Sequence, residues 1–269
     1  MTEETNKDNN IKSTIDAVTG LAKAIPIYND AVQPAAQEIG KSLATVTKTI
    51  NIALAPVSAL VWGYEKIRDY VLERVTEKLK DIPEEKIVTP DPAIVGPSLE
   101  ALRYAGKDVN LRELYASLIA TAMDADKIKT AHPGFVEIIK NLSSDEALLM
   151  QFFSRYDRHT LLDVKMTMKD GVGEFDLLRN VSLIGIKSKI SNASLTSNYI
   201  DNLCRLGLIE IPAGRHLMNE KLYDEIKELE LIKMEAEQIE KIDGKIIYAK
   251  KHTAITDFGR QFCNACITK

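Results

Sequence analysis

The chain has 269 residues, of which 45% are hydrophobic and 28% charged, the composition of an ordinary soluble globular protein with enough residues for a substantial core. Lysine and arginine number 35 against 39 aspartate and glutamate, and the net charge of −4 argues against a nucleic-acid binder, which needs a basic excess. Three cysteines, an odd number, argue against a disulfide framework and for a reducing compartment.

The N-terminal third is expected to be helical after a disordered polar tail over residues 1–10, which lacks the pattern of a secretory signal. We expect an N-terminal helical bundle over residues 11–82. Its last helix is predicted over 57–79, because apolar residues recur every fourth position at Ile67, Val71, Val75 and Leu79. The Pro-rich segment 83–97 is expected to exclude regular helix and to mark a boundary.

Residues 49–64 form an uncharged run of sixteen residues with two aromatic rings at its end, as at a membrane interface. A helix of that length spans only about 24 Å of the roughly 30 Å needed to cross a bilayer, and Pro56 interrupts it. We therefore favour a hairpin buried in the bundle, with membrane insertion on activation as the alternative. The candidate interaction or membrane residues are Ile50, Ile52, Leu54, Val57, Leu60, Trp62 and Tyr64.

Residues 83–155 are predicted to form a packed helical module. Between Leu111 and Ala122 the apolar residues lie at helical spacing and make one stripe that a neighbouring element must cover. The segments 135–142 and 148–153 are the expected partners.

Several motifs in this module and beyond it resemble the bacterial abortive infection alpha family. They are Leu99-Glu100-Ala101-Leu102, Leu111-Arg112-Glu113-Leu114-Tyr115, Ala122-Met123-Asp124, His132-Pro133-Gly134-Phe135-Val136, Asn202-Leu203-Cys204-Arg205-Leu206-Gly207 and Thr256-Asp257-Phe258-Gly259-Arg260. The resemblance covers roughly residues 25–267 and implies a role in phage defence in a bacterial cytoplasm. It brings no known activity and no catalytic residues with it.

The last part of the chain is expected to contain strands. Residues 156–194 form a strand-bearing connector with an alternating strand over 159–169. Residues 195–269 resemble a winged-helix domain: a helix over 195–206 ended by Gly207, a strand over 208–211, a charged helical insertion over 219–240, a strand over 245–248 and a helix over 257–267 capped by Thr256. The predicted fold class is therefore mainly α, a helical bundle followed by a winged-helix-like α+β domain.

A winged helix suggests DNA binding through the helix 195–206. Its candidate contact residues are Thr196, Ser197, Asn198, Asn202 and Arg205. One arginine cannot supply the several phosphate contacts that dominate affinity for DNA, so we favour the use of such a domain in protein association.

The sequence nominates no catalytic, cofactor-binding or metal-binding residues. Cys263 and Cys266 form a single CxxC pair without two further ligands at a recognisable spacing, and two small buried side chains explain the pair more simply. His132 is expected to contact the amides at the start of a helix, while His159, His216 and His252 are expected to face solvent. No common nucleotide-binding or hydrolase motif occurs.

Function is therefore predicted to be non-enzymatic anti-phage defence of the abortive infection type, acting by association with a protein partner or with itself in the cytoplasm. Two alternatives remain: a membrane-perturbing effector acting through residues 49–64, and a winged-helix DNA-binding regulator. Nucleic acid is the less favoured partner, no cofactor is expected, and a membrane enters as a partner on activation.

Overall fold

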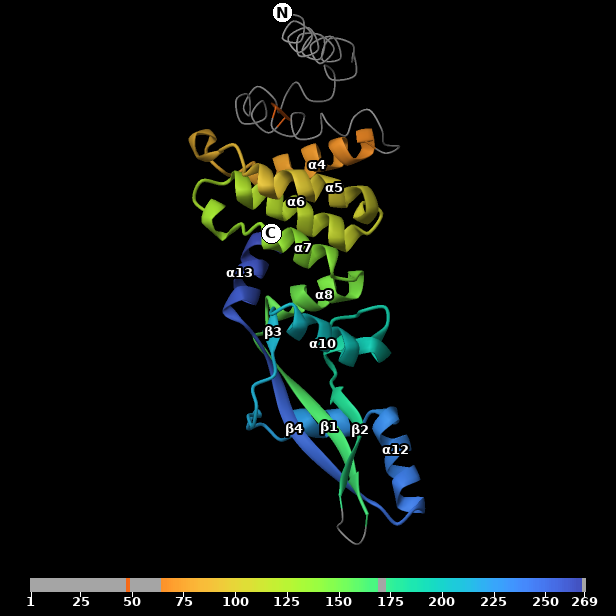
Figure 1. Cartoon of the computed structure of the whole chain (residues 1–269). Coiled ribbons are helices and arrows are strands. Elements are labelled where there is room, and N and C mark those ends of the chain that lie inside the picture. The colour runs from red at the N-terminus through yellow and green to blue at the C-terminus, as the bar shows by residue number, and fades with distance from the viewer. Residues whose placement is uncertain (1–46, 49–63, 169–172, 268–269) are drawn as a thin grey trace, which may run out of the picture. The chain divides into compact units, whose positions relative to one another are not determined.

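The computed structural model describes residues 47–48, 64–168 and 173–267 (Figure 1). The candidate residues Ile50, Ile52, Leu54, Val57, Leu60 and Trp62 lie outside the described residues, as does most of the predicted N-terminal bundle. Tyr64 is the first residue of helix α4. By chain contacts, residues 45–269 form one compact unit.

Helices make up the first half of that unit. They are α4 (Tyr64–Leu79), α5 (Pro92–Ala105), α6 (Val109–Met123), α7 (Gly134–Lys140) and α8 (Ser144–Phe153), with short 3-10 turns at Glu84–Lys86 and Ile128–Thr130. Helix α6 is central, because α4, α5, α7, α8 and the C-terminal helix all contact it (Figure 1). Every residue of α6 from Leu114 to Met123 is buried, as expected for a helix covered on all sides.

The predicted apolar stripes account for this packing. Val71, Val75 and Leu79 of α4 are at most 3% exposed, which confirms the four-residue spacing seen in the sequence. The stripe of α6 packs against α7 and α8, and this confirms the expected partners of that stripe.

The expectation that the Pro-rich segment excludes helix is wrong for its second half. Helix α5 begins at Pro92 and contains Pro97. Pro92 occupies the first helical position, where its missing N–H costs nothing, and Asp91 caps the helix by accepting a hydrogen bond from the amide of Ala93 at 2.8 Å. Gly96 precedes Pro97 and has no Cβ to collide with the proline ring, so the helix continues.

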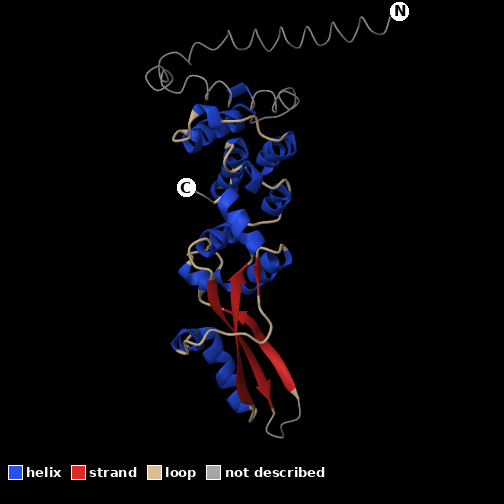
Figure 2. Cartoon of the chain, turned by 90° about the vertical axis from the view of Figure 1, so that its left-hand side faces the viewer, coloured by secondary structure: helices blue, strands red, loops and turns tan. Residues whose placement is uncertain are grey.

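The second half of the unit contains a four-stranded antiparallel sheet of order β2-β1-β4-β3 (Figure 2). Its strands are β1 (Arg158–Thr167), β2 (Glu174–Val181), β3 (Ile209–Glu210) and β4 (Lys245–Ile255). Strand β4 pairs with the whole length of β1, from Arg158 opposite Ala254 to Thr167 opposite Lys245. The helices are α9 (Ile184–Lys187), α10 (Thr196–Arg205), α11 (Lys221–Lys227), α12 (Glu230–Lys241) and α13 (Asp257–Cys266), with a 3-10 turn at Ala193–Leu195.

The predicted order of elements from residue 195 onward is found, but the winged-helix arrangement is not confirmed. Gly207, with a φ of 72°, follows α10, and Thr256 caps α13 by accepting a hydrogen bond from the amide of Gly259 at 2.8 Å. The expected strand 245–248 extends to Ile255, and strand β2 was not expected. The fold is thus helical plus an antiparallel sheet, and the long β1–β4 pair dominates that sheet.

The predicted helix 219–240 is two helices. Leu229 takes an extended conformation (φ −61°, ψ 135°) between α11 and α12. Helical spacing in this segment makes an apolar rail of Leu222, Ile226, Leu229 and Ile232. Ile226 and Ile232 of this rail are buried with Leu162, Val164 and Tyr223 in a small core of their own. A larger core joins α4–α8 with α10 and α13.

Candidate interaction surfaces

A carboxylate of α6 joins α4 to the central helix. Glu113 accepts hydrogen bonds from Tyr70 Oη at 3.1 Å and from Arg74 Nη2 at 2.8 Å and Nε at 3.1 Å. It also forms an ion pair with Lys78 Nζ at 2.7 Å. Tyr70, Arg74 and Lys78 lie four residues apart and therefore share one face of α4. The guanidinium of Arg112 lies 4.6 Å from the centre of the Tyr70 ring.

This cluster fixes the charge of Glu113. Burial by itself would raise the pKa of the Glu113 carboxyl, but the hydrogen bonds and charges of Arg74 and Lys78 outweigh that effect and lower the pKa to about 2. Burial, together with the neighbouring carboxylate, raises the pKa of Tyr70 to about 12. Glu113 is therefore ionised and Tyr70 protonated near neutral pH.

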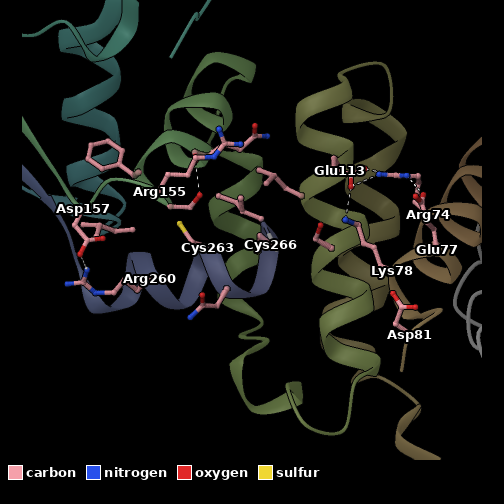
Figure 3. Close-up of a pocket in the computed structure, with 18 of the residues that line it drawn as sticks. Arg74, Glu77, Lys78, Asp81, Glu113, Arg155, Asp157, Arg260, Cys263 and Cys266 are labelled. Atoms are coloured by element: carbon pink, nitrogen blue, oxygen red, sulfur yellow. Dashed lines mark hydrogen bonds and ion pairs between the residues drawn. The ribbon is translucent and has the colours of Figure 1, made fainter. Parts of the chain in front are cut away.

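A groove of about 1050 Å³ opens beside this cluster, lined by α4, α6, α8 and α13 (Figure 3). Apolar residues of its lining include Leu114, Phe153 and Ile255, and its charged residues include Arg155 and the ion pair of Arg260 with Asp157 at 2.9 Å. Three carboxylates of the groove, Glu77, Glu113 and Asp157, are paired with cations, so their charges are largely neutralised.

The two CxxC thiols lie at this groove but are poorly suited to chemistry. Cys263 is 7% exposed and Cys266 is 1% exposed. Burial raises the pKa of the Cys263 thiol to about 12, and burial also raises the pKa of Cys266. Both are protonated at neutral pH, whereas the thiolate is the form that attacks substrates and binds metals. Within the described ranges, no three His, Cys, Asp or Glu side chains gather to hold a metal ion.

The histidines have structural contacts. His132 Nδ1 accepts a hydrogen bond from the amide of Gly134 at 2.9 Å, which confirms its expected position at a helix start. The expectation that His159 and His252 face solvent is wrong. His252 is 5% exposed, and the His159 ring packs on Phe152 and Phe153, where burial lowers its pKa to about 4.

The candidate DNA-contact residues of α10 make internal hydrogen bonds in four of five cases. Thr196 and Ser197 donate to the carbonyls of Ala193 and Arg179, at 2.6 and 2.8 Å. Asn202 Nδ2 donates to Glu146 Oε1 at 2.6 Å, and Arg205 donates to Asn202 Oδ1 at 2.7 Å. Asn198 is exposed. The polar face of α10 thus contacts α8, and DNA binding through this helix stays a prediction.

Helix α12 carries an exposed apolar face. Leu231, Met234 and Ile242 are 50%, 52% and 52% exposed, while Ile232 and Ile239 on the side facing the sheet are 1% and 3% exposed. The spacing of apolar residues predicted the buried side of this insertion, but the exposed side with Leu231, Met234 and Ile242 was not predicted. The signal was present, because Leu231, Met234, Gln238 and Ile242 also follow helical spacing.

Fold and surfaces together define a mixed protein of helices and an antiparallel sheet, with a charged groove and an exposed apolar face on α12. The sequence profile of the family described as abortive infection alpha matches residues 63–266, and the chain belongs to that family. No curated protein matches it.

A solved structure with some likeness is that of an uncharacterized protein from the hydrocarbon-degrading marine bacterium Alcanivorax borkumensis SK2. The match has 20% sequence identity and a TM-score of 0.36, and it covers 54% of this chain and 96% of that one. A likeness at this level carries no argument about function. None of the helices in the described ranges is both long and apolar enough to span a membrane.

Proposed function

We propose that this protein takes part in abortive infection by associating with another protein through the exposed face of α12, and that it does so without catalysing a reaction. Its family supports the defence role. The observation that carries the mechanism is the exposed stripe of Leu231, Met234 and Ile242, which we call the α12 stripe.

The stripe is costly unless it is covered. Three large apolar side chains, each about half exposed, lie on one side of a single helix instead of being scattered over the surface. Covering the exposed half of each would contribute about 1 kcal/mol per side chain. The opposite side of α12 is already buried against β4 and α11, so the stripe is not needed for folding.

The test is a phage challenge of cells that carry the double variant Leu231→Lys/Met234→Lys. We expect protection to be lost while the melting temperature of the purified protein stays within about 2 °C, because substitutions at exposed positions change stability by about 0.5 kcal/mol or less. The matched control is Met218→Lys, a methionine 88% exposed in the loop before α11. It should leave protection intact. Full protection by the double variant would refute the proposed role of the stripe.

A further inference from the structure

We propose that the partner of the α12 stripe is a basic amphipathic helix of another protein, with lysine or arginine flanking its apolar side chains. This inference rests on the proposed function and names the chemistry of the partner. Its basis is the charge around the stripe.

The stripe has the spacing of a helix-pairing seam. Leu231, Met234 and Gln238 are separated by three and then four residues, and Ile242 follows four residues later, directly after the last residue of α12. This spacing keeps the side chains on one side of a helix and matches the apolar positions through which two helices pack. The occupant that fits such a seam best is another helix.

The flanks of the seam are acidic. Helical geometry of 3.6 residues per turn places Glu235 on one side of the stripe and Glu230, Glu237 and one cation, Lys241, on the other, so that three carboxylates stand against one lysine. None of the three forms an ion pair in the described part of the chain, although Lys233 on the same helix pairs with Glu228 at 2.9 Å. Three carboxylates beside an apolar seam favour a partner that brings cations to the same positions.

The same charges disfavour a second copy of this chain. If two α12 helices paired through the stripe, in either direction, Glu235 or the pair Glu230 and Glu237 would face glutamates of the other copy. Like charges in those flanking positions are repulsive, and Lys241 supplies only one cation nearby. A basic helix would place cations beside these glutamates and would not be repelled by them.

The experiment measures binding of two labelled synthetic helices to the full-length protein by fluorescence anisotropy. Both peptides have leucine at every seam position; one has lysine and the other glutamate at the flanking positions. We expect the lysine peptide to bind at least tenfold more tightly than the glutamate peptide, and we expect its binding to weaken at 0.5 M salt. Leu231→Lys/Met234→Lys should weaken binding of the lysine peptide at least tenfold.

The charge-reversal variant Glu235→Lys/Glu237→Lys makes the test specific to the flanks. This variant should weaken binding of the lysine peptide and strengthen binding of the glutamate peptide. An unchanged circular dichroism spectrum is the control for folding. Equal binding of both peptides, or no effect of the reversal, would overturn the basic-helix proposal. A dimer in sedimentation that Leu231→Lys/Met234→Lys dissociates would also overturn it, in favour of a second copy.

The two proposals fail in different ways. If the double variant loses phage protection but the peptides bind equally, the role of the stripe stands and the basic partner is refuted. If the variant still protects, the proposed function is refuted whichever peptide binds.

Discussion

Glu113 joins α4 to α6 through polar contacts with three side chains of α4. This one carboxylate of α6 accepts hydrogen bonds from a tyrosine and an arginine and pairs with a lysine, and the three side chains come from successive turns of α4. With a side chain 29% exposed, it lies where such contacts are stronger than at an open surface and where an unpaired charge is costly.

Replacing Glu113 with glutamine should therefore lower the free energy of unfolding by about 2 kcal/mol, the scale of hydrogen bonds to a charged group. The pKa of this carboxyl is about 2 in the folded protein against an ordinary 4.5. A lowered folded-state pKa means that the contribution is complete above about pH 4.5 and is lost as the pH falls toward 2. Urea denaturation at several pH values measures both effects.

Glu137→Gln is the matched control, since Glu137 is 66% exposed and its ion pair is with Lys140 on its own helix. We expect it to cost less than about 0.5 kcal/mol. Equal losses for the two variants, or a pH dependence between 4.5 and 2 that survives in Glu113→Gln, would contradict the role given to Glu113.

At the scale of elements, the start of α13 packs closely against the chain segment that leads into β3. Thr256 caps α13 and also donates a hydrogen bond to the carbonyl of Gly207 at 2.6 Å. Gly259, in the first turn, lies directly on the chain before β3. A Cβ placed on Gly259 would be 1.9 Å from the carbonyl oxygen of Leu208 and 2.9 Å from Ile255 Cγ1.

Gly259→Ala should consequently destabilise the protein, although alanine is the better helix former. The atom that the new Cβ would meet belongs to the backbone of Leu208 and cannot rotate away, so α13 must shift away from that segment. We expect a loss of at least about 2 kcal/mol in the free energy of unfolding, measured by urea denaturation. A gain in stability, as alanine gives at an unobstructed helical glycine, would show that α13 is not held this closely.

On the scale of the whole molecule, the buried apolar residues form two cores of unequal size. The larger joins residues as far apart in sequence as Val71 of α4 and Cys266 of α13. The smaller holds α11 and α12 on the sheet with five buried residues: Leu162, Val164, Tyr223, Ile226 and Ile232. Because local stability follows buried apolar contact, the insertion should open at a lower free energy than the helices around α6.

Native-state hydrogen exchange read by mass spectrometry tests this. Amides of α11 and α12 should exchange faster than those of α6, with a difference in opening free energy of a few kcal/mol, about the span between local and global opening. Such a difference would let α12 adjust to a partner without unfolding the large core. Equal protection of α12 and α6 would show that the two cores open together.

The sequence by itself determined the helices whose faces are set by local spacing. The four-residue rail of α4, the stripe of α6, the end of α10 at Gly207 and the cap of α13 at Thr256 were all predicted, because each depends on residues within a few turns of one another. The histidine contact at the start of α7 was predicted for the same reason.

Only the tertiary structure decided the rest. Strand β2 escaped prediction because its register with β1 shifts around Val164, which breaks the alternation that reveals a strand. The break at Leu229 has no glycine or proline to announce it. The cluster around Glu113 and the exposure of the α12 stripe depend on which helices meet, and contacts between distant segments leave no pattern in the local sequence.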